Sequence, residues 1–413
     1  MKTALVAALG TAISTVALGL VPALAQTPAQ PAKDVKVALI APLSGPWARQ
    51  GQLMQMGADM AIDEINQKGG IKALGGAKMK LVVADAGDTT EKAKNAAERL
   101  LSQEPDLIGG TGAWLSSFTL AVTEVTERAQ LPWLTLSYSD AITDRGFKYV
   151  FQTSPTADHM AREMIPTVIK LAESAGAKRP QTMGIVMDNT AANVSYVKPM
   201  HEGWLDQYGL KLVVDQVYTP PLSDATPLIQ KVRSARPDFL LLLSSNVPDD
   251  KMLLEKLDEF GLGTRKLPTI GSGTHMGTPE LLKVTDAEML EGLLTGASDW
   301  GLKGQEDIIA RFRQRTGEPW INQDSITAYG DMWILKEAVE RVGAADRVKI
   351  GDELHKIDIT EGPAAVAYPG PVKFDDKGRR VDAPLIIVQW QKGQAVSVFP
   401  TDRALAKAFW PAQ

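Results

Sequence analysis

Small residues and hydroxyls come directly before an expected helix in the segment 109–117, Gly-Gly-Thr-Gly-Ala-Trp-Leu-Ser-Ser. The first turn of a helix has backbone N–H groups without internal partners and carries a partial positive charge, so this segment suits a carboxylate. It is not a nucleotide phosphate loop, because it lacks the Gly-Lys-Ser/Thr ending. We therefore predict ligand contacts at Trp114, Ser116 and Ser117. The alternative is that Ser116 only caps the helix.

A second hydroxyl-rich segment, 136–140, follows an expected strand. In extended backbone the side chains of Ser137 and Ser139 point the same way, and their hydroxyls would complete a carboxylate cradle. Tyr138 lies between them and adds an aromatic ring to the same loop. An ordinary Ser/Asp turn before the next helix is the alternative.

Two further loops carry weaker signals, at 42–51 and 270–275. In the first, Trp47 and Gln50 can face a cleft, although Trp47 could instead pack between domains. The second contains Gly273 in a Gly-x-Gly pattern, which predicts a ligand contact or only a tight turn.

The composition gives no support for catalysis or for a metal site. The chain has no Cys, and its four His residues, at positions 159, 201, 275 and 355, lack the spacing of a zinc site. It contains no Gly-x-Ser-x-Gly, no His-Glu-x-x-His and no dinucleotide fingerprint. A net charge of −5 without a basic stripe argues against nucleic-acid binding. We predict a protein that is not an enzyme and uses neither a cofactor nor a metal.

The first 25 residues have the pattern of a signal peptide. Lys2 precedes an apolar run of small residues, and Ala-Leu-Ala comes directly before Gln26. We expect cleavage after Ala25, export to the periplasm and a flexible segment at 26–34. Without a Cys there is no site for a lipid anchor.

Strands and helices alternate twice along the 388 residues that remain when 25 are removed from 413. A chain of this size usually divides into two domains. The first series has strands at 35–40, 79–84, 107–109 and 133–136, with helices at 54–65, 91–103 and 116–129. The second has strands at 182–187, 211–217 and 239–243, with helices at 160–174, 196–208 and 225–235. This alternation predicts an α/β fold with parallel sheets flanked by helices, which bind ligands beyond the carboxyl ends of their strands.

Several motifs together resemble one family of transport receptors. They are Ala-Pro-Leu-Ser-Gly-Pro at 41–46, Ala-Ile-Asp-Glu-Ile-Asn at 61–66, Gly-Gly-Ile at 69–71, Leu-Ser-Ser at 115–117, Ala-Tyr-Gly-Asp at 328–331 and Gly-Pro-Val-Lys-Phe-Asp at 370–375. Over nearly all of the mature chain the sequence resembles the type I periplasmic binding proteins related to the Leu/Ile/Val-binding protein. The resemblance implies two Rossmann-like lobes joined by a three-strand hinge, which close around a solute and present it to the membrane permease subunits of an ABC transporter. We expect a monomer.

The resemblance also implies lobe boundaries, with chain crossings near Thr153, His275 and Ala383. The expected lobes are 35–152 with 275–382, and 153–274 with 383–413.

Site residues follow from the same resemblance. Ser116 matches the serine that holds the ligand carboxylate, Ser137 a backbone-carbonyl contact and Ser139 a hydroxyl partner. Gln50 matches a first-loop pocket position. Asn193 matches a second-lobe contact that is often tyrosine.

One departure from the family bears on the ligand. Amino-acid binders commonly place an acidic residue in the loop 271–274 to pair with the ligand ammonium, and this chain has Ser-Gly-Thr at 272–274. A buried ammonium without a counter-charge is costly, unless Asp140, Asp224 or Asp299 substitutes. Aromatic residues near the loops can stack on a planar ligand. We therefore favour a non-amino organic acid, an aromatic one in particular, over a branched-chain amino acid.

Two other functions remain as alternatives. A secreted hydrolase would use Ser116 or Ser137, but no general base stands in a recognisable motif. A ligand-sensing module would use the same fold with a separate signalling partner.

Overall fold

The computed structural model describes residues 1–5, 7 and 33–411. The predicted signal peptide, its cleavage position and most of the segment 26–34 lie outside the described residues. Among the described residues no helix is long and apolar enough to cross a membrane, and no group of three His, Asp or Glu side chains could hold a metal ion.

The first lobe is built on a five-stranded parallel sheet with the order β2-β1-β3-β4-β5. Its strands are β1 (Val35–Ala41), β2 (Met79–Asp85), β3 (Leu107–Gly112), β4 (Trp133–Thr135) and β5 (Val150–Gln152). The helices that belong to it are α1 (Ala48–Gln67), α2 (Thr90–Gln103), α3 (Ser116–Arg128), α10 (Glu306–Thr316), α11 (Gln323–Val342), α12 (Arg347–Leu354) and α13 (Gly362–Ala367). Short 3-10 turns are η1 (Gly45–Trp47), η2 (Lys72–Leu74) and η3 (Asp140–Ile142), and β11 (Asp358–Ile359) pairs with β12 (Val372–Lys373).

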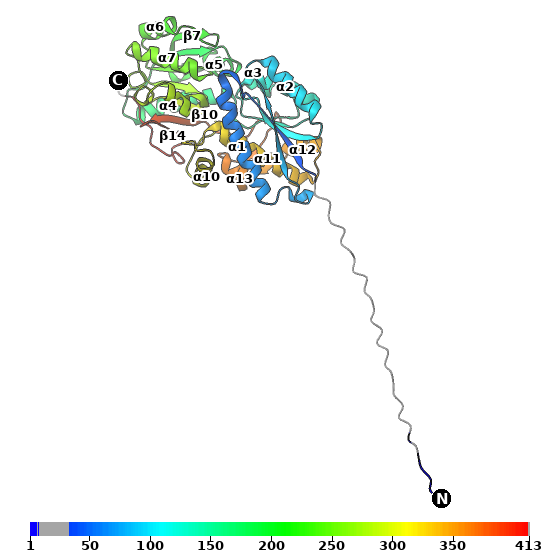
Figure 1. Cartoon of the computed structure of the whole chain (residues 1–413). Helices are drawn as coiled ribbons and strands as arrows, with labels where there is room; N and C mark the ends of the chain where they lie inside the picture. The colour runs from blue at the N-terminus through cyan, green and yellow to red at the C-terminus, as the bar shows by residue number, and fades with distance from the viewer. Residues whose placement is uncertain (6, 8–32, 412–413) are drawn as a thin grey trace. The chain divides into compact units, whose positions relative to one another are not determined.

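Helices far apart in sequence meet in this lobe, as α1 and α11 do in Figure 1. The approach is close because Gly57 of α1 has no side chain. A Cβ at Gly57 would lie 1.9 Å from the carbonyl oxygen of Ser325. Residues after position 305 therefore return to complete the core of the first lobe.

The second lobe is built on a seven-stranded mixed sheet with the order β14-β13-β10-β9-β8-β6-β7. Its strands are β6 (Thr182–Asp188), β7 (Lys211–Tyr218), β8 (Phe239–Leu243), β9 (Thr269–Ser272), β10 (Leu294–Ala297), β13 (Ile386–Gln391) and β14 (Gln394–Phe399). Its helices are α4 (Ala157–Ser174), α5 (Ala191–His201), α6 (Thr226–Ala235), α7 (Val247–Glu259), α8 (Pro279–Val284) and α9 (Ala287–Leu290), with 3-10 turns η4 (Trp204–Tyr208) and η5 (Thr274–Gly277).

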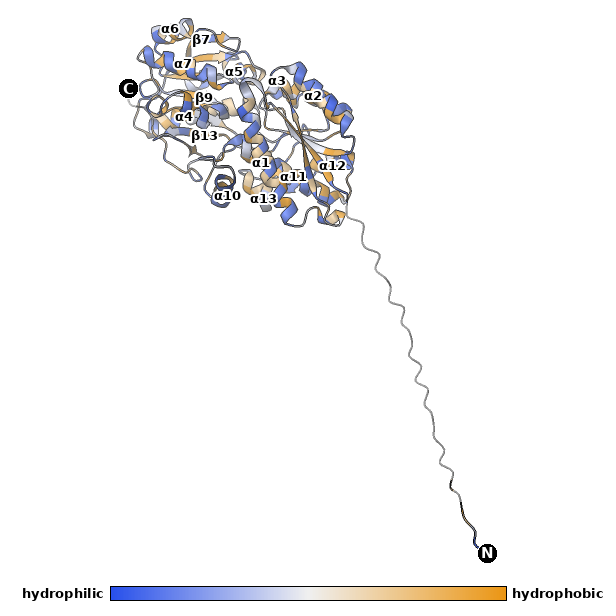
Figure 2. Ribbon diagram, in the orientation of Figure 1, coloured by the Kyte–Doolittle hydropathy of each residue, from blue (hydrophilic) through white to orange (hydrophobic). Residues whose placement is uncertain are grey.

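Both faces of this second sheet are covered by apolar residues. In β8, Phe239, Leu241 and Leu243 join one hydrophobic core, and Leu240 and Leu242 join the other. Successive strand side chains point to opposite faces, so a strand covered on both sides must be apolar throughout. Figure 2 shows this pattern as apolar strands between helices with hydrophilic outer faces.

The boundary predicted at His275 is wrong. β10 pairs with β9 and with β13, and Trp300 and Leu302 still lie in a core of the second lobe. The chain enters the first lobe only near Ile308. The prediction failed because strand β10, four residues long, has no recognisable pattern in the sequence, and only its pairing assigns it to a sheet.

The three segments that connect the lobes meet at Arg380. Its backbone N–H donates to Gln152 O (2.9 Å) and its Nε to Thr153 O (2.7 Å), in the first segment. The second segment contributes Asp299, and the neighbouring helix α11 contributes Asp331; both carboxyls are buried. Burial raises the pKa of Asp299 to about 7 and that of Asp331 to about 6, against the attraction of Arg380.

These raised pKa values predict how stability changes with pH. A carboxyl whose folded pKa exceeds its unfolded value near 4 binds its proton more tightly in the folded protein, so stability falls as pH rises from about 4 to about 7. The variant Asp299→Asn should flatten this decline and be more stable than the unaltered protein at pH 8 by roughly 2 kcal/mol. Urea unfolding at pH 4, 6 and 8 measures the effect. Asp376→Asn, at an exposed position, is the control, and an unchanged slope in Asp299→Asn would contradict the prediction.

Candidate functional site

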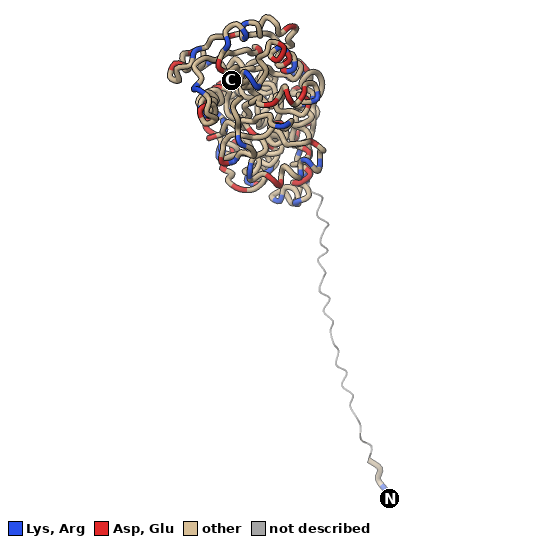
Figure 3. The backbone as a smooth tube through the Cα atoms, turned by 90° about the vertical axis from the view of Figure 1, so that its left-hand side faces the viewer, with Lys and Arg blue, Asp and Glu red and all other residues tan. Residues whose placement is uncertain are grey.

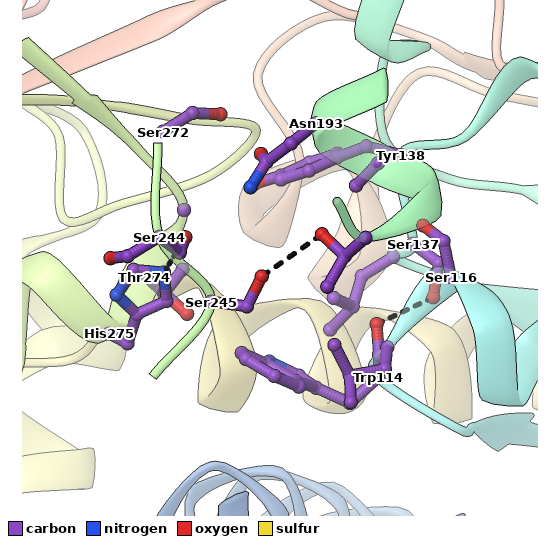
Figure 4. A pocket seen from close by; sticks show the side chains of 15 residues that line it. Trp114, Ser116, Ser137, Tyr138, Asn193, Ser244, Ser245, Ser272, Thr274 and His275 are labelled. Atoms are coloured by element: carbon purple, nitrogen blue, oxygen red, sulfur yellow. Dashed lines mark hydrogen bonds between the residues drawn. The ribbon is translucent and has the colours of Figure 1, made fainter. Parts of the chain in front are cut away.

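A cavity lies between loops that follow strands of both sheets (Figure 4). About 60 Å³ of it is open to the centres of water molecules, several times what a single water needs, so it suits a small ligand. The lining residues are Trp114, Leu115, Ser116, Leu136, Ser137, Tyr138, Thr190, Ala192, Asn193, Ser244, Ser245, Ser272, Gly273, Thr274 and His275. The loops follow β3, β4, β6, β8 and β9, as expected for an open parallel sheet.

The chain reaches the cavity from β3 through a left-handed turn. Gly112, Ala113 and Trp114 have φ angles of 124°, 68° and 54°. Only glycine fits at position 112, because a Cβ would lie 1.9 Å from Ile40 O. Left-handed conformations of Ala and Trp are unfavourable and collect at ligand-binding sites. Here the turn places Trp114 in the cavity wall, where its Nε1 donates to Asp324 Oδ1 at 2.9 Å.

The start of α3 offers unused hydrogen-bond donors. Ser116 is its first residue, the preceding Leu115 provides no side-chain cap, and the first turn holds no acidic residue. Ser116 Oγ accepts the N–H of Ser139 at 3.1 Å, and its own hydroxyl hydrogen has no acceptor among the described residues. Ser116 therefore does not act as the helix cap. Its hydroxyl and the free N–H groups of the turn can all donate to an anion.

Ser137 lines the cavity but uses its polar groups within the first lobe. Its hydroxyl donates to Trp114 O (2.7 Å) and accepts from Thr119 (2.6 Å). Its carbonyl accepts from Gln152 Nε2 (2.7 Å) and from Ser154 Oγ (3.1 Å). Both lone pairs of the carbonyl are occupied, so the backbone contact expected from the family is not available in this structure.

Other predicted residues lie beside the cavity. Ser139 Oγ is 3.0 Å from Ser195 Oγ of α5, and Trp47 Nε1 donates to Ser245 O at 2.9 Å, so both join the two lobes. Trp47 packs edge-on against Phe118, as the interdomain alternative expected. The predicted positions that the described cavity lining does not include are Trp47, Gln50, Ser117 and Ser139. The predicted positions that it includes are Trp114, Ser116, Ser137, Tyr138, Asn193 and Gly273.

The sequence reasoning missed most of the second-lobe wall. Thr190, Ser244 and Ser245 follow strands that were predicted correctly, so the strand-end rule applied to the first lobe would have found them. His275 was taken only as a chain crossing. Asp324 gave no signal, because it belongs to α11 and reaches the site only through tertiary packing.

His275 is held as a cation. Its Nδ1 lies 2.8 Å from Asp250 Oδ2 and its Nε2 lies 3.0 Å from Ser244 O, and both oxygens only accept hydrogen bonds. Burial disfavours the charged imidazole, but the attraction of Asp250 outweighs it and the pKa of His275 is raised. Both ring N–H groups are used, so neither is free for a ligand.

The cavity offers no ionic partner for a ligand ammonium. The described lining contains no Asp, Glu, Lys or Arg. Of the three substitutes considered, Asp140 accepts the N–H of Asp158, Asp224 is exposed before α6, and Asp299 lies in the hinge. The nearest carboxyl, Asp324, has a pKa raised by burial to about 6 and accepts from Trp114 and Thr274. It joins the walls of the two lobes instead of facing a ligand.

A family model described as "Periplasmic binding protein" matches residues 34–395. This chain belongs to that family. The family supplies the non-enzymatic, solute-binding component of ABC transporters, and the two-lobe α/β fold with its interlobe cavity is the fold of its type I members. A curated relative, Leu/Ile/Val-binding protein homolog 7 of Brucella melitensis biotype 1, is 28% identical over 388 residues and covers 92% of this chain and 94% of its own length.

Two solved structures of other periplasmic binding proteins show the same fold. The branched-chain amino acid transporter substrate-binding protein LivJ from Streptococcus pneumoniae, in complex with isoleucine, has a TM-score of 0.74 at 19% identity, with 88% of this chain and 100% of that chain covered. A solute-binding protein from R. palustris in complex with benzoate has a TM-score of 0.74 at 17% identity, with 92% and 99% covered. At these identities the likeness concerns the fold alone.

Proposed function

We propose that this periplasmic binding protein binds a small non-amino carboxylate, an aromatic acid in particular, in the interlobe cavity. The observation that carries the proposal is the start of α3, which has unused donors and no acidic residue. No carboxylate in the described lining pairs with an ammonium, and Ser137 O is already bonded. Trp114 and Tyr138 supply aromatic surface.

In this proposal Ser116 and the first turn of α3 hold the ligand carboxylate, and Asn193, Gly273 and the other second-lobe residues enclose it as the hinge closes. The protein acts in the periplasm as a monomer after removal of its signal peptide, and it delivers the ligand to the permease subunits of an ABC transporter. Charges of both signs are interspersed along the backbone view in Figure 3, so no single-sign surface favours another class of partner.

A branched-chain amino acid is the second candidate ligand, since the curated relative is named a Leu/Ile/Val-binding protein homolog and the LivJ structure holds isoleucine. Binding assays distinguish the two candidates. Protein 26–413 would be unfolded to remove bound ligand, refolded, and heated with panels of aromatic acids, aliphatic acids and amino acids. A ligand at 100 times its Kd stabilises the folded state by about 2.7 kcal/mol, which a thermal shift detects. A shift confined to amino acids would refute the non-amino proposal.

Ser116→Ala should weaken binding of the acid found in this way by roughly 10- to 100-fold, because it removes one hydrogen bond to a charged group worth about 1.5–3 kcal/mol. Thr90→Ala is the matched control. Thr90 is likewise the first residue of a helix in the same lobe, and it is exposed. Calorimetric titration gives both Kd values. Equal affinity in the Ser116 variant and the unaltered protein would show that the carboxylate does not lie at α3.

A further inference from the structure

Asn193 lies in the second-lobe wall of the cavity, one turn into α5, and is 5% exposed. Its Nδ2 donates to Asp188 Oδ1 at 2.8 Å and to Leu243 O at 2.9 Å. A carboxylate oxygen and a carbonyl oxygen only accept, so the amide cannot be turned over without facing two acceptors with its own oxygen. Both hydrogens of Nδ2 are therefore used, and Oδ1 is the only group that Asn193 can offer a ligand.

The neighbouring hydroxyls have also used their hydrogens. Thr190 donates to Asp188 Oδ1 at 2.6 Å, so in its 3.0 Å contact with Ser245 the serine must be the donor. Ser244 donates to Asp250, and Thr274 donates to Asp324. With both N–H groups of His275 engaged as well, Ser272 is the one polar side chain of the described second-lobe lining whose hydrogen has no acceptor.

The two helix starts at the cavity differ in charge. The start of α5 has a carboxylate beside it, because Asp188 accepts the backbone N–H of Thr190 at 3.0 Å. Asp188 is fully buried, and its Oδ2 has no partner among the described residues. The start of α3 has no acidic residue in its first turn. A ligand carboxylate is therefore favoured at α3 and disfavoured at α5.

We infer that Asn193 selects, among small carboxylates, those that also carry a hydrogen-bond donor, which its Oδ1 accepts. The ligand is then asymmetric, with an anionic group at Ser116 and a hydroxyl, amine or amide N–H at Asn193. This inference rests on the proposed function and narrows it. It concerns specificity because a buried acceptor left without a donor is costly, so an acid without the donor binds less well.

Matched acids test the inference by calorimetric titration of the refolded protein 26–413. One set is benzoate with its 3-hydroxy and 4-hydroxy derivatives. Another is 4-methylpentanoate with its 2-hydroxy derivative and leucine. Terephthalate presents a second carboxylate in place of a donor. We expect one hydroxy or amino derivative to bind at least about tenfold more tightly than its parent acid, and terephthalate to bind more weakly than benzoate.

The variant Asn193→Leu should reduce that advantage to less than about threefold and leave the parent acid's Kd within about threefold of its original value. Asn189→Leu is the control, since Asn189 is exposed in the same loop, and its amide donates to Thr219 Oγ1. The comparison of matched acids with the unaltered protein needs no variant, so it stands even if Asn193→Leu does not fold.

Three results would overturn the inference: equal binding of parent and derivative acids, tighter binding of terephthalate than of benzoate, or an undiminished advantage in Asn193→Leu. Each leaves carboxylate binding intact. If no carboxylate binds at all, the proposed function itself fails. The set in which the advantage occurs tells a hydroxyl donor from an ammonium donor.

Discussion

Gly112→Ala should lower the free energy of unfolding by roughly 4 kcal/mol. Two penalties combine at this position. The φ angle of 124° lies in a region that only glycine adopts readily, and an added Cβ would lie 1.9 Å from Ile40 O. The clash is with backbone at the centre of a sheet, because β1 and β3 are paired there. Relief therefore requires β1 and β3 to separate.

Gly343→Ala is the matched control for this prediction. Gly343 ends α11 with a φ angle of 66°, and nothing lies within 4 Å of its added Cβ. Its substitution should cost only about 1 kcal/mol, the usual penalty for a left-handed alanine. Urea unfolding measures both variants. A difference below about 1 kcal/mol between them would show that the strand pair yields easily. Because Gly112 begins the turn to Trp114, ligand affinity should fall in Gly112→Ala alone.

Arg380→Met should lower the free energy of unfolding at pH 8 by about 3–5 kcal/mol, since removing one partner leaves buried charge without compensation. Arg380 is 4% exposed, stacks on Tyr368 and faces the buried carboxyls of Asp299 and Asp331. Without the guanidinium the pKa of both carboxyls should rise further. The loss should therefore shrink at pH 5, where the carboxyls take up protons.

The adjacent residue provides the control for this second prediction. Arg379 pairs with Asp144 at 3.0 Å, and both side chains are partly exposed, so Arg379→Met should cost no more than about 1 kcal/mol. Adding Asp299→Asn to Arg380→Met should restore part of the stability, because it removes one of the uncompensated carboxylates. Equal losses at pH 5 and pH 8 in Arg380→Met would mean that packing, and not charge, dominates at Arg380.

Much of the site could be predicted because parallel sheets place their functional loops at the strand ends. The loops after β3 and β4 were identified from hydroxyls and glycines next to a helix start, and the structure places Trp114, Ser116, Ser137 and Tyr138 in one cavity wall. The same rule did not give the direction of each polar group. Ser137 directs its hydroxyl and carbonyl into its own lobe, and Ser139 contacts Ser195 across the cleft.

The sequence by itself determined the α/β class, the two lobes and the family, since these depend on local periodicity and contiguous motifs. Tertiary structure alone decided which sheet takes β10, because four residues carry no signal of their partners. It also decided that Asp324 joins the lobes, that Arg380 meets all three connecting segments, and that Asn193 offers only an acceptor. Each of these depends on groups far apart in the chain, whose charges and hydrogen bonds interact only after folding has buried them together.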